Sequence, residues 1–269
     1  MGKLLVENQV TYSTDPYDPE VELVFLNTCG FISSGREEAL ATVKKLLKKG
    51  KKVCITGCAV KYREDLTNSK DEERTAIKPQ ISIYPRNEIG QLFMTSTPRA
   101  LTNIDNKFEY LKIAEGCNNA CSFCIIPKIR GKQISLPIPT ILQEIRNLIQ
   151  QGAEEIILIA QDSTRYGTDL YGKPQLFELL EQIEQVEGNF HYRVLYLYPD
   201  LLTLHQLKKL TSFKKFIPYF DIPLQHISSS VLQRMGRFYD EQAIYTFLNF
   251  IKSEFPIHFI RTNFIIGFP

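Results

Sequence analysis

The sequence has 269 residues, of which 43% are hydrophobic and 23% charged, which is enough for one large or two ordinary soluble domains with buried cores. Its formal net charge of +2 gives the whole chain no strong attraction to nucleic acid or to a membrane surface. No apolar run reaches the roughly 18 residues of a membrane-spanning helix and the N-terminus lacks a signal-peptide pattern, so we expect a cytoplasmic protein with reduced thiols.

The first part of the chain has the pattern of a strand, a helix and a second strand. Residues 21–28 (VELVFLNT) and 51–57 (KKVCITG) are short apolar runs typical of strands. Between them a helix is predicted, which Ser33 or Ser34 can cap, with acidic residues in its first turn, lysines in its last turn and Gly50 at its end. This order predicts parallel strands in an α/β sheet.

A cysteine follows each of these two strands. Cys29 comes just after the first strand and Cys58 just after the second. The carboxyl ends of parallel strands form the edge at which open α/β sheets bind ligands, so both thiols are placed where a ligand would lie. Cys54 lies within the second strand and is most simply a small buried residue.

The next residues contain a connector between two predicted domains. Residues 81–85 (ISIYP) predict a further short strand, and residues 87–96 predict a helix. A polar run with Pro98 follows and has the composition of a connector. We therefore place a domain boundary near residue 104, which divides the chain into residues 1–103 and 104–269.

The second part of the chain alternates strands with helices. The predicted strands are residues 108–116, 154–162, 191–199, 216–226 and 257–267. The predicted helices are residues 139–152, 174–188, 201–212, 228–237 and 240–254. Because eight such units close a full barrel, five strands predict an α/β fold with an open, partial barrel or a chain that is cut short.

Three of the six cysteines lie in the stretch EGCNNACSFCIIPKIRG, with the spacing C-x3-C-x2-C at Cys117, Cys121 and Cys124. Thiolates are soft ligands, and three of them on one tight loop can hold three corners of an iron–sulfur cube. No fourth cysteine follows in the loop, so one iron would keep an open position, as catalytic metals do. A zinc site, for which the nearest histidine is His191, and simple redox cysteines are the alternatives.

The pattern C-x3-C-x-aromatic-C, after the first strand of a repeating β/α unit, resembles the radical S-adenosylmethionine superfamily. The resemblance implies a partial (β/α)6 barrel and a [4Fe–4S] cluster on Cys117, Cys121 and Cys124. Its open iron would bind the amino and carboxylate groups of S-adenosylmethionine, and one electron would cleave the sulfonium to give a 5′-deoxyadenosyl radical. The resemblance places Phe123 beside the adenine, with ordinary loop packing as the alternative.

A longer match, YLKIAEGCNNACSFCIIPKIRG together with NTCGFI and TGC in the first part, resembles the methylthiotransferases of that superfamily. Those enzymes carry an N-terminal α/β domain in which three cysteines hold a second [4Fe–4S] cluster used in sulfur insertion. The resemblance implies that Cys29 and Cys58 are two of those three ligands. It also implies an electron donor, which the sequence does not identify.

Two types of methylthiotransferase compete for this sequence. One modifies an adenosine in tRNA, and the other, the RimO type, modifies the β-carbon of an aspartate in the twelfth small-subunit ribosomal protein. The stretches NTCGFISSGRE, CSFCIIPKIRG, AQDSTRYG and YFDIPLQHISSSVLQRMGR resemble the RimO type. The near-neutral charge also favours a protein substrate mildly, because a tRNA-binding protein often has a basic face. The tRNA enzyme remains the alternative.

The sequence departs from the family pattern at both ends. The Gly-Cys-x-Lys-Asn segment that supplies the first ligand of the second cluster is not found before Cys29, and Cys54 is the alternative to it as a ligand. The sequence ends at IIGFP, where the family continues into further β/α elements and a small TRAM domain. We therefore expect a chain truncated at both ends, and an inactive truncated product is the alternative to an active enzyme.

Four further side chains are candidates for the cavity that binds cofactor and substrate. The resemblance places three of them at this cavity. Gln161 and Asp162 lie at the end of the second predicted barrel strand, and Gln225 lies at the end of the fourth. Arg261 lies inside the fifth predicted strand, where an unpaired charge is costly to bury, so we expect it to pair with a carboxylate of cofactor or substrate. Solvated strand ends and an edge arginine are the alternatives.

Overall fold

The computed structural model describes residues 11–62, 81–83 and 107–269. The chain divides into two compact units, residues 1–102 and residues 103–269. The predicted boundary near residue 104 lies outside the described residues, so its position stays a prediction, and so does the helix predicted for residues 87–96. Within the described ranges, no helix is long and apolar enough to cross a membrane.

The first unit is a small parallel sheet with one helix. Its elements are β1 (Leu23–Thr28), α2 (Ser33–Lys48), β2 (Lys52–Gly57), the 3-10 helix η1 (Cys58–Tyr62) and β3 (Ile81–Ile83). The strands pair in the order β1-β2-β3, and Val24 lies opposite Val53. Val43 and Leu46 of α2 belong to the same buried core as these two valines, which confirms the predicted strand–helix–strand unit.

Helix α2 does not begin as predicted. Ser33 is already its first helical residue, Ile32 before it is extended, and no side chain caps the N-terminus. No acidic residue lies in the first turn, because the helix starts at Ser33 and Glu37 therefore falls in the second turn. The predicted basic last turn is present, with Lys45 and Lys48, so the serine cap and the acidic first turn are wrong while the lysine pattern is right.

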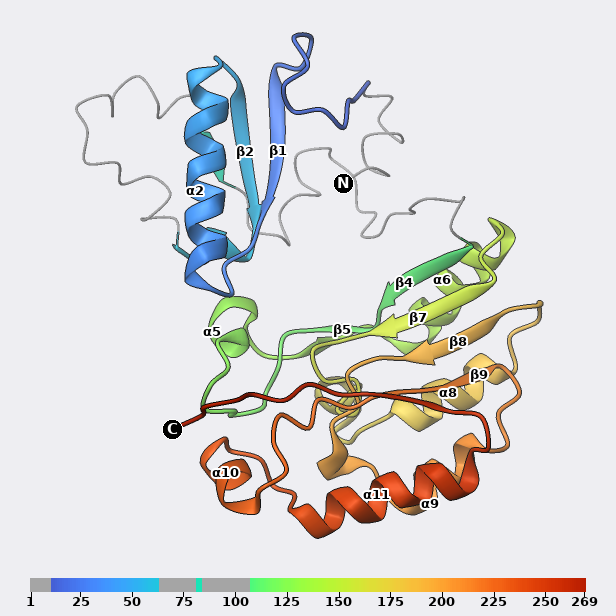
Figure 1. Ribbon diagram of the computed structural model, residues 1–269. Helices are drawn as coiled ribbons and strands as arrows, with labels where there is room; N and C mark the ends of the chain where they lie inside the picture. The colour runs from blue at the N-terminus through green and yellow to red at the C-terminus, as the bar shows by residue number, and fades with distance from the viewer. Residues whose placement is uncertain (1–10, 63–80, 84–106) are drawn as a thin grey trace. The chain divides into compact units, whose positions relative to one another are not determined.

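The second unit is built on a five-stranded parallel sheet (Figure 1). Its strands are β4 (Phe108–Lys112), β7 (Glu155–Ile159), β8 (His191–Val194), β9 (Phe216–Asp221) and β10 (Phe259–Arg261). Its helices are α5 (Ile126–Arg130), α6 (Ile138–Gln150), α7 (Thr168–Tyr171), α8 (Leu176–Glu184), η5 (Pro199–Leu201), α9 (Leu204–Leu210), α10 (Ser229–Arg234) and α11 (Glu241–Glu254). A short antiparallel pair, β5 (Ala114–Glu115) and β6 (Ile134–Ser135), completes the unit.

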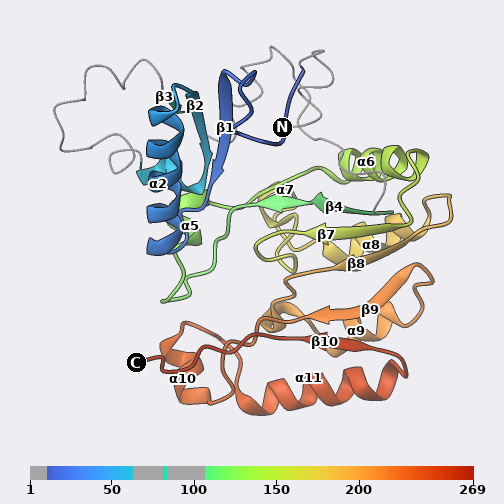
Figure 2. The ribbon, with the colours of Figure 1, turned by 45° about the horizontal axis from the view of Figure 1, so that its top comes forward.

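Alternate side chains of the five-stranded sheet form its buried face. Leu111, Leu158, Val194 and Phe220 are neighbours in the register of β4, β7, β8 and β9, and all four are buried. Helices α6, α8, α9 and α11 run along the outside of this curved sheet (Figure 2). The order β10-β9-β8-β7-β4 leaves β10 and β4 as edges of the described sheet, so the predicted partial barrel is confirmed.

All five barrel strands are shorter than predicted. Strand β4 ends at Lys112, and β9 ends at Asp221, five residues before the predicted end. Pro223 has no N–H to donate to a neighbouring strand, which explains why β9 does not continue. Strand β10 comprises only Phe259–Arg261. The loops at the carboxyl edge of the sheet are therefore longer than the sequence pattern indicates.

Candidate functional site

The cysteine loop follows β5, at the carboxyl end of β4. The Cys117 N–H donates to the Gly131 oxygen at 3.1 Å, so the start of the loop is tied to the residue after α5. Gly116 has a φ of 84°, and a Cβ at this position would lie 2.1 Å from the Lys132 oxygen. Only a glycine allows the two chain segments to approach so closely, and their contact closes the loop at its base.

The three thiols of this loop lie within electrostatic range of one another. Burial raises the pKa of Cys117, the Asn119 N–H opposes this by donating to its sulfur at 3.4 Å, and the Cys121 and Cys124 thiols raise it further. Cys117 is buried, whereas Cys121 and Cys124 are half-buried. A loop that gathers three thiols in a partly water-free place is suited to thiolate ligands of a metal group.

The donor set fits an iron–sulfur cluster better than a single ion. Among the described residues, no three His, Cys, Asp or Glu side chains come close enough together to hold one metal ion. A tetrahedral zinc keeps each thiolate sulfur at about 2.3 Å, which forces the sulfurs into mutual contact. A cube places each cysteine on a different iron, so its thiolates stand further apart. The described side chains therefore disfavour the zinc alternative, and the placing of Cys117, Cys121 and Cys124 at three corners of a cube stays a prediction.

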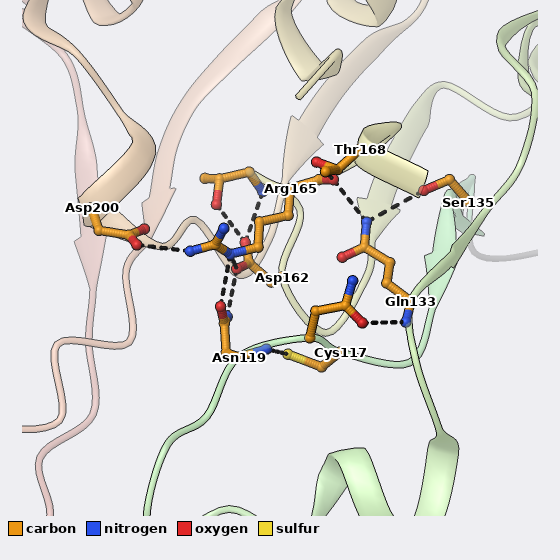
Figure 3. Close-up of polar contacts among 10 residues, drawn as sticks. Cys117, Asn119, Gln133, Ser135, Asp162, Arg165, Thr168 and Asp200 are labelled. Carbon is orange, nitrogen blue, oxygen red and sulfur yellow. Dashed lines mark hydrogen bonds and ion pairs between the residues drawn. The ribbon is translucent and has the colours of Figure 1, made fainter. Parts of the chain in front are cut away.

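A buried polar network holds the loop from the side of β7 (Figure 3). The Asn119 amide donates to Asp162 at 2.7 Å, and Arg165 donates to the Asn119 oxygen at 2.7 Å. Arg165 also pairs with Asp162 at 3.3 Å and with Asp200 at 2.9 Å. Burial raises the pKa of Asp200, and the Arg165 guanidinium opposes that rise. The network fixes Asn119, which lies between Cys117 and Cys121, by charge-assisted hydrogen bonds.

Two further contacts anchor the loop. The Gln161 side chain accepts a hydrogen bond from the Gly116 N–H at 2.5 Å. The Asn118 side chain accepts one from the Gln133 N–H at 3.1 Å. Gln161 and Asp162 were both predicted at the cofactor cavity, and the structure places both against the cysteine loop. Their contact with a cofactor stays a prediction, since their polar groups bond to the protein itself.

The end of α10 packs against the other side of the loop. The Ser122 N–H donates to the Met235 oxygen at 3.1 Å, and the Ser122 hydroxyl to the Arg234 oxygen at 2.9 Å. Gly236 has a φ of 71°, and a Cβ there would lie 2.8 Å from the Ala120 oxygen. The backbone after α10 is therefore in direct contact with the loop between the first and second cysteines of the trio.

The remaining predicted cofactor residues lie in different places. Phe123 belongs to the cysteine loop and meets Phe268 edge-to-face, with 6.3 Å between ring centroids. Gln225 does not end a strand: it lies beyond β9, has a φ of 69°, and its backbone bonds to Asn263 and Ile265. The premature end of β9 explains this difference. Adenine contact by Phe123 and cofactor contact by Gln225 stay predictions.

Arg261 pairs with a carboxylate of the protein. It is the last residue of β10, lies opposite Asp221 in the register, and its Nε is 3.7 Å from the Asp221 Oδ1. The Arg261 side chain is 48% exposed, so its charge is not buried as the argument from its predicted strand assumed. Because the described strand β10 is short and at an edge, solvent reaches this guanidinium. A role in binding cofactor stays a prediction.

The cysteines of the first unit follow neighbouring strands. A Cβ at Gly30 would lie 2.6 Å from the Cys58 oxygen, so the loops after β1 and β2 cross in backbone contact. Cys29 is exposed and Cys58 half-buried, which leaves both accessible to a ligand. Cys54 is 2% exposed within β2, and burial raises its pKa to about 11, as expected for an inert core thiol. A metal role for Cys29 and Cys58 stays a prediction.

Sequence reasoning missed the polar and charged residues that surround the cysteine loop. Asn119 lies within the cysteine motif, and Arg165 lies three residues after Asp162, but neither spacing signals a bond between them. Asp200 and Arg237 are distant in sequence and come close only through the barrel fold. A useful signal was the run Gly236-Arg237 after a short helix, because a glycine at a helix end often marks close packing.

Two family models match the chain. The model described as the radical SAM superfamily matches residues 111–269, and the model described as uncharacterized protein family UPF0004 matches residues 1–77. The first match covers more than half of the chain and includes the cysteine loop and the barrel. The second contains Cys29 and Cys58.

Two similar curated proteins share one name. The ribosomal protein uS12 methylthiotransferase RimO of Carboxydothermus hydrogenoformans is 40% identical over 275 residues, covering 93% of this chain and 61% of that protein. The protein of the same name from Aquifex aeolicus is 39% identical over 263 residues, covering 94% of this chain and 59% of that protein. The chain thus spans about three fifths of the length of these relatives.

Solved structures support the fold. The radical S-adenosylmethionine methyltransferase TsrM from Kitasatospora setae, solved with cobalamin and a [4Fe–4S] cluster, superposes with a TM-score of 0.62 at 12% identity, covering 94% of this chain and 60% of that one. The cobalamin-dependent radical enzyme OxsB, solved with S-adenosylmethionine, gives 0.58 at 12% identity, covering 92% and 41%. The family model over residues 111–269 shows that the chain belongs to the radical SAM superfamily, and within it the chain is similar to the RimO methylthiotransferases.

Proposed function

We propose that this chain contributes the cluster-binding and barrel parts of an enzyme that methylthiolates ribosomal protein uS12. The observation that carries the proposal is the cysteine loop, in which three mutually interacting thiols lie on one closed loop at the carboxyl edge of a parallel barrel. Ligands of parallel β/α folds bind at that edge. The similarity to the RimO proteins, which are named for action on uS12, supports the choice of substrate.

Cys117, Cys121 and Cys124 would hold a [4Fe–4S] cluster that leaves one iron free for S-adenosylmethionine. When bound, this group would supply one electron for reductive cleavage of the sulfonium, and so the means to abstract hydrogen from an unactivated carbon. Burial raises the pKa of Cys117 and of Cys121, so both thiols keep their protons until metal binds. Cluster assembly would therefore release protons, as it does for other thiolate sites.

The protein's own residues would hold the loop in place. Gln161 accepts from the backbone just before Cys117, and Asp162 fixes Asn119 just after it. These groups restrict the loop to one conformation before metal binds, which lowers the cost of assembling the site. Arg165 neutralises the buried Asp162 and ties it to Asp200. We assign this network to positioning the cysteine ligands.

Cys29 and Cys58 would be two ligands of a second cluster, whose site would supply the sulfur that is inserted into the substrate. The crossing of the loops after β1 and β2 supports their use as a pair. The atom modified would be the β-carbon of an aspartate in uS12. The reaction requires an electron donor in addition to S-adenosylmethionine.

The test combines a binding assay with mass spectrometry. The full chain, reconstituted anaerobically with iron and sulfide, should show iron–sulfur charge-transfer absorbance and should cleave S-adenosylmethionine when reduced. Cells of the source organism that lack the gene should lose the methylthio group from uS12 and keep the methylthio groups of their tRNA. Loss of the group from tRNA alone would reassign the enzyme to tRNA adenosine. A colourless protein that cleaves no S-adenosylmethionine would identify an inactive product.

A further inference from the structure

The guanidinium of Arg237 is buried without a full set of partners. Arg237 is 7% exposed, and both its Nε and its Nη1 lack a hydrogen-bond partner. In the part of the chain that the structure describes, no carboxylate lies within ion-pair distance of it. The charge of Arg237 acts on Asp200, but that carboxylate is already paired with Arg165, so the buried guanidinium has no ion-pair partner of its own and the position calls for an anion.

The neighbours of Arg237 place that anion at the cysteine loop. Its guanidinium carbon lies 4.3 Å from the centroid of the Tyr198 ring and 5.6 Å from that of Phe123. Gly236, directly before it, is in backbone contact with Ala120, as described above. Two aromatic faces and a backbone contact thus hold the cation beside the residues that flank Cys121.

Tyr198 and Arg237 act on the same cysteine. Burial raises the pKa of Cys121, and the Arg237 charge and a hydrogen bond from the Tyr198 hydroxyl both oppose that rise. Tyr239 also contacts the guanidinium: burial raises the pKa of Tyr239 to about 12, and the Arg237 charge and a hydrogen bond that Arg237 donates to it oppose that rise. Tyr239 in turn donates to the Leu224 oxygen at 2.9 Å, which fixes its orientation. The charge of Arg237 therefore acts on Cys121, whose Cα lies 3.6 Å from a Cβ built at the neighbouring Gly236.

We propose that Arg237 is the counter-charge of the cluster at Cys121. Its charge and a hydrogen bond from the Tyr198 hydroxyl together raise the reduction potential of that cluster. The inference rests on the proposed function, since it needs a cluster on the three cysteines. Adding one electron adds one negative charge, and a nearby fixed cation or a hydrogen bond to a ligand sulfur stabilises the reduced form. Arg237 is thus a positioning and tuning residue that acts through Cys121.

The test compares charge-removing variants by redox titration. Wild type, Arg237→Gln, Arg237→Lys, Tyr198→Phe and the control Arg234→Gln are reconstituted anaerobically, and iron per chain is measured for each. Arg234 is exposed at the end of α10, so its substitution removes the same charge from a solvated site. The cluster is then reduced stepwise with dithionite, in the absence of S-adenosylmethionine, and its reduced signal is followed by electron paramagnetic resonance.

We expect Arg237→Gln to lower the equilibrium constant for reduction about tenfold, which for a one-electron couple is about 59 mV toward more negative potential. Tyr198→Phe should shift it in the same direction by less, Arg237→Lys should keep most of the wild-type value, and Arg234→Gln should not shift it. If Arg237→Gln takes up no iron, the potential of Tyr198→Phe tests the inference instead, because this variant keeps the aromatic ring and removes only the hydroxyl.

Three results would overturn the inference. One is an unchanged potential in Arg237→Gln, or in Tyr198→Phe, at wild-type iron content. Another is an unchanged potential together with weaker binding of S-adenosylmethionine, measured by its effect on the resonance signal; that would assign Arg237 to the carboxylate of the cofactor. The third is a wild-type chain that binds no iron, which removes the proposed function itself and so is distinguishable from the first two.

Discussion

Replacing Gly116 by alanine tests how the cysteine loop is closed. Gly116 has a φ of 84°, and the added Cβ would lie 2.1 Å from the Lys132 oxygen and 2.8 Å from the Gly131 oxygen. Both contacts are with backbone, which cannot move aside as a flexible side chain can. Gly172 is a matched control, because its φ of 72° imposes similar strain while nothing lies within 4 Å of the added atom.

The two substitutions separate strain from overlap. An alanine in the left-handed region costs about 1–2 kcal/mol, which is the whole expected effect at Gly172. At Gly116 the overlap should add about 1–3 kcal/mol, the usual cost of overpacking. The free energy of unfolding is measured by urea titration, with the slope checked for two-state behaviour. Equal losses for Gly116→Ala and Gly172→Ala would refute the closed-loop reasoning, as would wild-type iron uptake in Gly116→Ala.

Three further predictions follow from the buried groups and the sheet edge. Asp162→Asn removes the charge that pairs with Arg165, and we expect a loss of about 2–4 kcal/mol in urea unfolding with lower iron uptake; no loss would contradict the role of the network. The raised pKa of Cys54 contributes about 2–3 kcal/mol to the free energy of unfolding. This contribution is complete below pH 9 and is lost as the pH rises toward 11, because the thiol of the unfolded chain ionises first. Urea titrations of wild type and Cys54→Ala at pH 8 and 11 should show this loss in wild type only, and parallel curves would reject it. Arg261→Gln removes an exposed partner of Asp221, so we expect a loss under about 1 kcal/mol, and a loss above 2 kcal/mol would show that the pair is not screened by solvent.

The sequence was sufficient to predict the order of the main strands and helices, but not the short helices α5 and α7 or the β5–β6 pair. Short apolar runs marked strands such as β7, in which the consecutive residues Ile156, Ile157 and Leu158 are all buried in the sheet. The cysteine spacing marked the loop, because three thiols within eight residues must lie near one another whatever the surrounding fold. Short-range patterns of this kind depend only on residues close together in the sequence, so they can be recognised without the tertiary structure.

The contacts around the loop could not be predicted in the same way. Asn119 and Asp162 are 43 residues apart, and their bond depends on how β4 and β7 pair. Arg237 reaches Cys121 only because the segment after α10 packs on the loop. Strand ends were also misjudged, since Pro223 ends β9 although the apolar pattern continues to Leu224. These features depend on tertiary contacts that no periodicity encodes.

Iron binding by the three loop cysteines tests the central claim most directly. Iron and acid-labile sulfide per chain are measured after anaerobic reconstitution of wild type and of a variant with Cys117→Ala, Cys121→Ala and Cys124→Ala. We predict that the variant contains about four fewer irons per chain than wild type, one cube's worth, and that only wild type shows a resonance signal altered by S-adenosylmethionine. Equal iron content in the two proteins, or an unaltered signal in wild type, would contradict the assignment of these cysteines to a radical SAM cluster.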